Sequence, residues 1–226
     1  MSQERALKVA PSFSVDQFAQ LRLDPETPET ADWKAAIAAF DGRFKSRYFN
    51  ILDELAARPP AAEPEAQPSD YEDPLTDHEV VPGFVILSVI FLLMETLEGF
   101  RKGDTSHGSR AKRLFTDFLT RLALTDKTGE RRITLAEAEE LYKIGRCAFL
   151  HSAGSEGIRI RRTGPSIRKI DAVRFEINRT ALLARVKQEF EDYGAALREP
   201  ANVELRRNFI AKMSFICKAH GAPAAA

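Results

Sequence analysis

Cysteine and long hydrophobic runs are scarce in this sequence of 226 residues. The two cysteines, Cys147 and Cys217, are too few for a disulfide framework and are not spaced as metal ligands, which favours a reducing cytoplasm. The one long apolar stretch, Val80–Met94, is shorter than the roughly 20 residues that cross a bilayer. The sequence also begins without the basic start and apolar run of a signal peptide. We therefore expect a soluble cytoplasmic protein with no membrane partner, in which this stretch is a central core helix.

Catalytic motifs are scarce as well. The sequence contains no glycine-rich phosphate loop, no dinucleotide fingerprint, no HExxH or CxxC pattern and no GxSxG nucleophile elbow. These absences argue against the common nucleotide-dependent, metal-dependent and serine-nucleophile enzymes, so we expect neither a cofactor nor a metal. Arginine and histidine remain as the residues that can carry chemistry.

Charge is balanced overall but unevenly distributed. The chain has 33 Lys and Arg against 33 Asp and Glu, of which residues 1–80 hold 8 against 16 and the remainder 25 against 17. This asymmetry suggests that the basic part binds a polyanion. Charge alone says little about the fold.

Apolar residues at three- and four-residue spacing predict a mainly α fold. Long helices are expected over 31–57 and 80–102, followed by one over about 111–122. Capping boxes at Ser14–Gln17 and Thr134–Glu137 each predict a helix start. Two further amphipathic helices are expected near the C-terminus, with apolar faces that contain Leu183, Val186, Phe190, Tyr193 and Leu197, and Leu205, Phe209, Met213 and Ile216.

These elements divide the chain into an N-terminal segment, 1–30, with one short helix, a single helical domain, 31–219, and a disordered tail, 220–226. Within the domain, residues 59–79 hold seven acidic residues, five prolines and no Lys or Arg, a composition typical of a flexible loop. Residues 157–178 change to a period of two around the sequence TGPS, which predicts a β-hairpin.

A polar pair interrupts the helix that follows the second capping box. Arg146 and His151 stand in the stretch RCAFLH, an R-x4-H motif near the end of an otherwise apolar helix. Arg101 and His107 have a similar spacing, but the residues between them, KGDTS, are expected to form a loop. A loop does not hold the two side chains in a fixed relative position. The Arg146–His151 motif in a helical domain resembles that of the HEPN-domain superfamily, over roughly residues 31–197.

The resemblance implies an antiparallel helical bundle with the β-hairpin inserted after the motif helix. It also implies a homodimeric, metal-independent endoribonuclease of a toxin or antiphage-defence system, with an antitoxin or another defence protein as a partner. Arg146 and His151 would then be catalytic, because a neutral histidine can take the proton of an RNA 2′-hydroxyl and a guanidinium can hold the attacked phosphate. The products would carry 2′,3′-cyclic phosphate ends. Apolar residues on several sides of the helix 141–153 agree with a two-fold dimer.

Two alternatives stay open. A catalytically inactive HEPN-like module binds nucleic acid, a nucleotide or a partner protein with the same fold, and Cys147 stands where the family often has Asn, Asp or His after the arginine. Arg146 can also be a structural residue, because Glu95 and Glu98 of the core helix are candidate ion-pair partners.

Basic residues gather in the predicted hairpin after the motif. Five of them are candidates for contact with RNA phosphates, namely Arg159, Arg161, Arg162, Arg168 and Lys169. Few aromatic residues lie between them, so base stacking is not indicated. A solvated strand face is the alternative interpretation.

Overall fold

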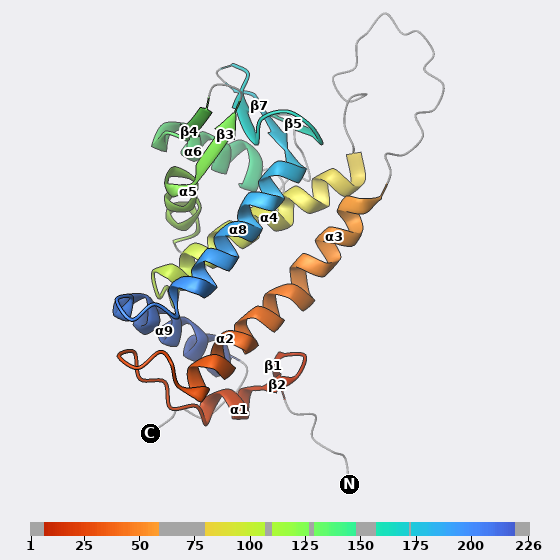
Figure 1. Ribbon diagram of the computed structural model, residues 1–226. Helices are drawn as coiled ribbons and strands as arrows, with labels where there is room; N and C mark the ends of the chain where they lie inside the picture. Colours follow the sequence, from red (N-terminus) through yellow and green to blue (C-terminus); the bar gives the residue numbers. More distant parts are fainter. Residues whose placement is uncertain are drawn as a thin grey trace, which may run out of the picture. The chain divides into compact units, whose positions relative to one another are not determined.

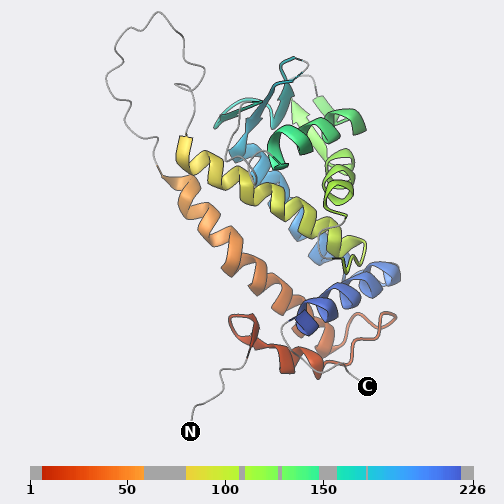
Figure 2. The same ribbon diagram turned by 180° about the vertical axis from the view of Figure 1, so that it is seen from behind.

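Figures 1 and 2 show a computed structural model of the chain, which describes residues 7–58, 80–106, 110–126, 129–147, 157–171 and 173–219. Helices dominate these residues, which confirms the predicted mainly α fold. The predicted acidic loop, 59–79, and the predicted tail, 220–226, lie outside the described residues. The chain divides into two compact units, which we describe separately.

The first unit consists of residues 1–51, 97–109 and 188–226. Its described elements are β1 (Lys8–Ala10), β2 (Phe13–Ser14), α1 (Val15–Ala19), α2 (Ala31–Phe44), the π-helical turn η1 (Lys45–Phe49), the second half of α8 (Arg179–Ala196) and α9 (Val203–Ala219). Phe40 of α2 lies in its core. Ring centroids at 4.7–5.7 Å from that of Phe40 belong to Phe44, Phe100, Phe190, Tyr193 and Phe209. Aromatic pairs at this spacing add to the stabilisation from buried area.

Arginines of the first unit bind backbone carbonyls. The fully buried Arg206 of α9 donates to four of them, those of Pro25, Leu197, Glu199 and Pro200. Arg43 donates to the carbonyl of Val9 at 3.0 Å, and Arg47 to that of Lys8 at 3.1 Å. These hydrogen bonds tie the three arginine side chains to the backbone near the end of α8, at Pro25 and along β1.

The second unit consists of residues 52–96 and 110–187. Its described elements are most of α3 (Asn50–Ala57) and α4 (Val80–Arg101), then α5 (Ala111–Arg121), β3 (Ala123–Asp126), β4 (Gly129–Arg132), α6 (Leu135–Leu141), the π-helical segment η2 (Tyr142–Cys147), β5 (Ile158–Arg161), β6 (Ile167–Lys169), β7 (Phe175–Asn178) and the first half of α8. The core includes side chains of α4 that are at most 1% exposed, those of Ile86, Leu87, Ile90, Phe91, Leu93 and Met94.

The helix α4 extends beyond the apolar stretch that the sequence marks. It has 22 residues. Its part Gly83–Arg101 is long and apolar enough to cross a membrane by length and composition, so the prediction that the apolar stretch is too short for a bilayer is wrong. However, 67% of that apolar window is buried within the protein, as in the core helix of a soluble protein. The burial of α4 therefore supports the predicted core helix, although its length alone does not.

The two predicted helix starts are confirmed. Ser14 Oγ accepts from the N–H of Gln17, and the side chain of Gln17 accepts from the N–H of Ser14, as in a capping box. Thr134 and Glu137 form the same arrangement at the start of α6. The helix expected over 31–57 is one helical run, in which η1 interrupts the α-helical pattern.

The predicted β-hairpin over 157–178 is wrong in its pairing. Three strands form a sheet in the order β5–β7–β6, with β5 parallel and β6 antiparallel to β7. All four residues of β7 are buried, and Asn178 at its end binds the turn between the other two strands. Its Nδ2 donates to the carbonyl of Gly164 at 2.7 Å, and its N–H donates to that of Ser166 at 3.1 Å. The turn at TGPS therefore reverses the chain, but β7 lies between its two flanking strands.

Gly145 permits a close approach between η2, α4 and β5. A Cβ at this position would lie 2.7 Å from Ile158 Cδ1 and 2.9 Å from Phe91 Cε2. Phe91 and Glu95 are one turn apart on the same face of α4. The approach at Gly145 therefore brings the next residue, Arg146, beside Glu95.

We predict that Gly145→Ala destabilises the protein by about 1–3 kcal/mol, because the added methyl overpacks a buried contact. Gly42→Ala in α2 is the matched control, since its Cβ would meet nothing nearer than Ala10 Cβ at 3.7 Å, an ordinary contact distance. That change should stabilise by roughly 0.5–1 kcal/mol, the usual gain of alanine over glycine inside a helix. Urea denaturation of both variants measures the difference, and similar shifts in the two would contradict the packing at Gly145.

Candidate functional site

The R-x4-H motif is described only in part. Arg146 lies in η2, whereas His151 lies outside the described residues, as does His107 of the second match. The position of the arginine is therefore known, and the catalytic role of His151 stays a prediction.

Arg146 forms a bidentate ion pair with Glu95 of α4. Its Nε donates to Oε1 at 2.6 Å and its Nη2 donates to Oε2 at 3.0 Å. The side chains of Arg146 and Glu95 are 20% and 10% exposed, so water screens the pair only weakly. Of the two candidate partners in the sequence, Glu95 is the one that binds Arg146, while Glu98 lies 3.7 Å from Lys102 Nζ.

Burial and charge act in opposite directions on this pair. Burial raises the pKa of Glu95, and the hydrogen bond and charge of Arg146 lower it, with a net shift upward. The hydrogen bond from Glu95 raises the pKa of Arg146, and burial lowers it, again with a net shift upward. The carboxylate therefore depends on the neighbouring guanidinium to stay charged in this buried position.

The ring of Tyr142 fixes a second side of the guanidinium. Its centroid lies 5.7 Å from Cζ of Arg146, a cation–π distance, and 5.5 Å from the ring of Phe115. Burial raises the pKa of Tyr142, so the phenol stays neutral at physiological pH. Arg146 is thus held by a carboxylate at one edge and by an aromatic ring on one face.

Among the described residues, the contacts of Arg146 leave one edge of its guanidinium unused. The contact with Glu95 uses Nε and Nη2, and no acceptor within the described part of the chain binds Nη1. A guanidinium fixed in this way presents its remaining N–H groups as a preorganised ligand for an anion. The carboxylate also cancels its charge, which weakens the long-range attraction for a phosphate.

The apolar residues of the motif helix pack within the chain. Ala138 and Leu141 of α6 are fully buried, and Ile144 of η2 lies against Gly157, where a Cβ would come within 2.9 Å of Ile144 Cδ1. For residues 141–147, the described part of the predicted helix 141–153, packing inside the second unit accounts for the apolar pattern that the sequence analysis assigned to a dimer. The described part of this helix therefore gives no separate reason for a second copy.

A second basic site lies on the three-stranded sheet. Arg159 of β5 and Arg168 of β6 stand in register with Glu176 of β7, and Arg161 is on the same side of β5 as Arg159. Arg161 Nε donates to Glu176 Oε2 at 2.7 Å, and Arg168 Nη2 lies 2.9 Å from Oε1. We call these four residues the arginine face. Three guanidinium groups and one carboxylate give it a net charge of about plus two.

Glu176 organises the arginine face. Its side chain is 7% exposed, whereas those of Arg161 and Arg168 are 30% and 56% exposed. Burial raises the pKa of Glu176, but the hydrogen bond and charge of Arg161 and the charge of Arg168 outweigh burial and lower it. Arg159 has no ion-pair partner among the residues that the structure describes. Glu176 therefore remains ionised and holds Arg161 and Arg168 in place. The charge of Arg159 is not balanced by a carboxylate among these described residues.

The other two predicted RNA-contacting residues lie elsewhere. Arg162 Nη2 donates to the carbonyl of Arg58 after α3 at 2.7 Å. Lys169 Nζ donates to Glu140 Oε2 of α6 at 2.5 Å and lies 5.6 Å from the ring centroid of Phe175. The structure thus brings together three of the five residues that the sequence suggested.

Metal binding and thiol chemistry find no support in the described residues. They contain no group of three or more His, Cys, Asp or Glu that can hold a metal ion. Burial raises the pKa of the Cys217 thiol to about 11, so this cysteine is not a nucleophile at neutral pH. Cys147 is half-buried beside Arg146.

Glu176 is the residue of this site that the sequence analysis did not single out. Its alternation with Phe175 and Ile177 was visible and placed it on the polar side of a strand. The contact between Glu176 and Arg161 was missed because the parallel pairing of β5 with β7 was not predicted.

Comparison of the chain with models of protein families, with curated proteins and with solved structures found no match. The function is therefore inferred from the geometry of the site and from the motif.

We predict that Arg146→Ala destabilises the protein at neutral pH by about 1–3 kcal/mol, because it leaves the Glu95 carboxylate buried without its partner. The pKa of Glu95 is already raised and should rise further in the variant. The loss should therefore shrink as the pH falls toward that raised pKa, where Glu95 takes up a proton. Denaturation at several pH values measures this dependence.

Lys112→Ala is the control for this prediction. It breaks an ion pair with Glu139 whose side chains are 56% and 47% exposed. An exposed pair contributes about 0–1 kcal/mol, and its loss should depend little on pH in the same range. Equal losses for Arg146→Ala and Lys112→Ala would show that the Glu95 pair is not shielded from water.

Proposed function

We propose that this protein binds RNA through its phosphate backbone and that the arginine face is the contact surface. The observation that carries the proposal is the grouping of Arg159, Arg161 and Arg168 around one carboxylate on one side of the sheet. This face keeps a net positive charge of about two, and at least one of its guanidinium groups, that of Arg168, is largely exposed.

The chemistry of the face suits phosphate better than bases. A planar guanidinium donates two parallel hydrogen bonds to phosphate oxygens, and an arginine fixed by a carboxylate loses less freedom when it does so. Phe175, an aromatic residue of the sheet, is fully buried on the opposite side of β7 and is not available for stacking. Contact with phosphates positions a nucleic acid without reading its sequence.

Metal-independent RNA cleavage is a second candidate function, and the open edge of Arg146 favours it. With Nε and Nη2 fixed by Glu95, the remaining N–H groups can hold a phosphate while His151 takes the proton of the 2′-hydroxyl. The resemblance to HEPN proteins places such an activity in a cytoplasmic toxin or antiphage-defence protein with a defence-system partner. In that candidate, a two-fold dimer would complete the site with a second motif.

Binding stands ahead of cleavage because Glu95 neutralises Arg146. A catalytic arginine must attract and stabilise a phosphate that gathers negative charge, and a paired carboxylate opposes both. The arginine face has no such deficit, because its one carboxylate pairs with only two of its three arginines. Binding also needs only described residues, whereas cleavage depends on His151.

We predict that replacing Arg159, Arg161 and Arg168 together by glutamine weakens binding of a single-stranded RNA oligonucleotide and lowers its salt dependence. Each phosphate contact that is lost should reduce the slope of log affinity against log salt by about 0.7. Fluorescence anisotropy at several salt concentrations measures both quantities. Arg174→Gln is the control, because Arg174 is 57% exposed and pairs with Asp171 in the turn before β7. An unchanged slope in the triple variant would remove the arginine face from RNA binding.

We further predict the outcome that separates the two functions. If the protein cleaves RNA, it should do so in EDTA and leave 2′,3′-cyclic phosphate ends, and His151→Ala should lower the rate by about 10²–10⁴-fold. His107→Ala, which alters the second match, should leave the rate unchanged. Incubation with total cellular RNA followed by gel analysis tests both. A wild-type protein that binds RNA and leaves it intact would exclude cleavage and keep binding.

A further inference from the structure

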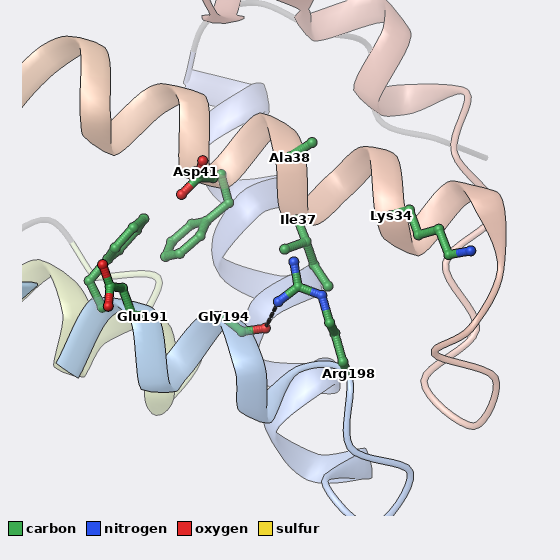
Figure 3. A pocket seen from close by; sticks show the side chains of 9 residues that line it. Lys34, Ile37, Ala38, Asp41, Glu191, Gly194 and Arg198 are labelled. Carbon is green, nitrogen blue, oxygen red and sulfur yellow. Dashed lines mark hydrogen bonds between the residues drawn. The ribbon is translucent and has the colours of Figure 1, made fainter. Parts of the chain in front are cut away.

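A hollow of about 400 Å³ lies between α2 and α8 in the first unit (Figure 3). Its floor is apolar and includes Ile37, Phe40 and Phe190. Its rim carries residues of both charge signs and two small residues, namely Lys34, Ala38 and Asp41 from α2 and Glu191, Gly194 and Arg198 from α8 and its end. The RNA-binding proposal makes no use of this site.

Like charges face each other across the hollow. Lys34 and Arg198 lie at one end, and Asp41 and Glu191 lie at the other (Figure 3). Within the described residues, Lys34, Glu191 and Arg198 have no ion-pair partner, and Asp41 pairs with Lys45 at 2.9 Å. Arg198 instead donates to the carbonyl of Gly194 at 2.7 Å. The arrangement leaves each end complementary to a group of opposite sign.

Small residues line the middle of the hollow. Gly194 lies inside α8, where glycine is less favourable than alanine. The chain has room for a methyl there, since its nearest neighbour would be Arg198 Nη1 at 4.0 Å, so packing within the chain does not require glycine. Ala38 is exposed on the facing helix. A glycine beside an exposed alanine admits the close approach of another backbone.

We propose that this hollow is a homodimer interface in which α2 of a second copy lies antiparallel to α2 of the first. Lys34 and Asp41 are seven residues apart, about 10 Å along the helix, and on the same face. A two-fold axis beside Ala38 therefore places Lys34 of the partner subunit over the acidic end, and Asp41 of the partner subunit over the basic end. The same contacts form twice, as a two-fold interface requires.

The charge pattern indicates that the occupant of the hollow is a second copy of the chain. Glu191 and Arg198 are also seven residues apart, but here the acidic residue comes first along the chain, whereas on α2 the basic residue comes first. Both walls of the hollow therefore have their basic residue at one end and their acidic residue at the other (Figure 3). Two-fold rotation reverses that polarity and converts every facing pair of like charges into a pair of opposite charges. A helix from a different protein would need an acid and a base two turns apart.

The test exchanges the charges at each end. Lys34→Glu with Arg198→Glu makes the hollow acidic throughout, and Asp41→Lys with Glu191→Lys makes it basic throughout. Each double variant alone should have a dimer dissociation constant raised about 100-fold or more, because like charges then face each other across the interface. An equimolar mixture of the two should dimerise again. Light scattering and sedimentation of the full chain over a range of micromolar concentrations measure the mass.

Arg22→Glu with Lys218→Glu is the matched control. Both residues are exposed in the first unit outside the hollow, and the change in net charge equals that of the acidic variant. This control should keep the dimer. A monomeric wild type, dimerisation of either swapped variant alone, or a mixture that stays monomeric would overturn the proposal. A helical peptide with Glu and Lys seven residues apart that binds a monomeric wild type would instead identify a different protein as the occupant.

Discussion

A carboxylate that is taken out of water has to be compensated, and the second unit is organised around two such groups. Glu95 on α4 is compensated by Arg146, and Glu176 on β7 by Arg161 and Arg168. The first pair joins α4 to η2, which are distant in the sequence, and the second set of contacts joins β7 to both of its neighbours in the sheet. Removing one member leaves a buried charge, so these contacts fix position more than they add stability.

Three kinds of arginine in the described residues differ in what they bind. Arg206, Arg43 and Arg47 bind backbone carbonyls and complete the first unit. Arg146 binds a single carboxylate and is neutralised by it. The arginine face has more guanidinium groups than carboxylates and therefore keeps an excess of positive charge. A count of basic residues along the sequence overestimates the surface that remains for a polyanion.

The elements that depend on local periodicity were predicted from the sequence. The helices over 31–57 and 80–102 and both capping boxes follow from residues within a few positions of each other, so they were found. The pairing of β5 with β7 was missed because it joins strands separated by a third strand, and no local pattern records that order. The choice between Glu95 and Glu98 as the partner of Arg146 depends on the rotation of α4 in the core. The packing of the buried side chains of α4, including the contact of Phe91 with Gly145, settles that rotation.

The π-helical form of η2 carries a consequence for how this segment tolerates insertions and deletions. A π-helical turn closes its hydrogen bonds over five residues instead of four, so it holds one residue more than an α-helical turn. The extra residue is absorbed within one wide turn, so loss of a single residue between Tyr142 and Cys147 would restore the α-helical pattern and keep the flanking residues in phase. Loss of one residue from the regular helix α6 would instead turn Arg146 by about 100° away from Glu95. The π-helical segment therefore tolerates a change in length that α6 does not.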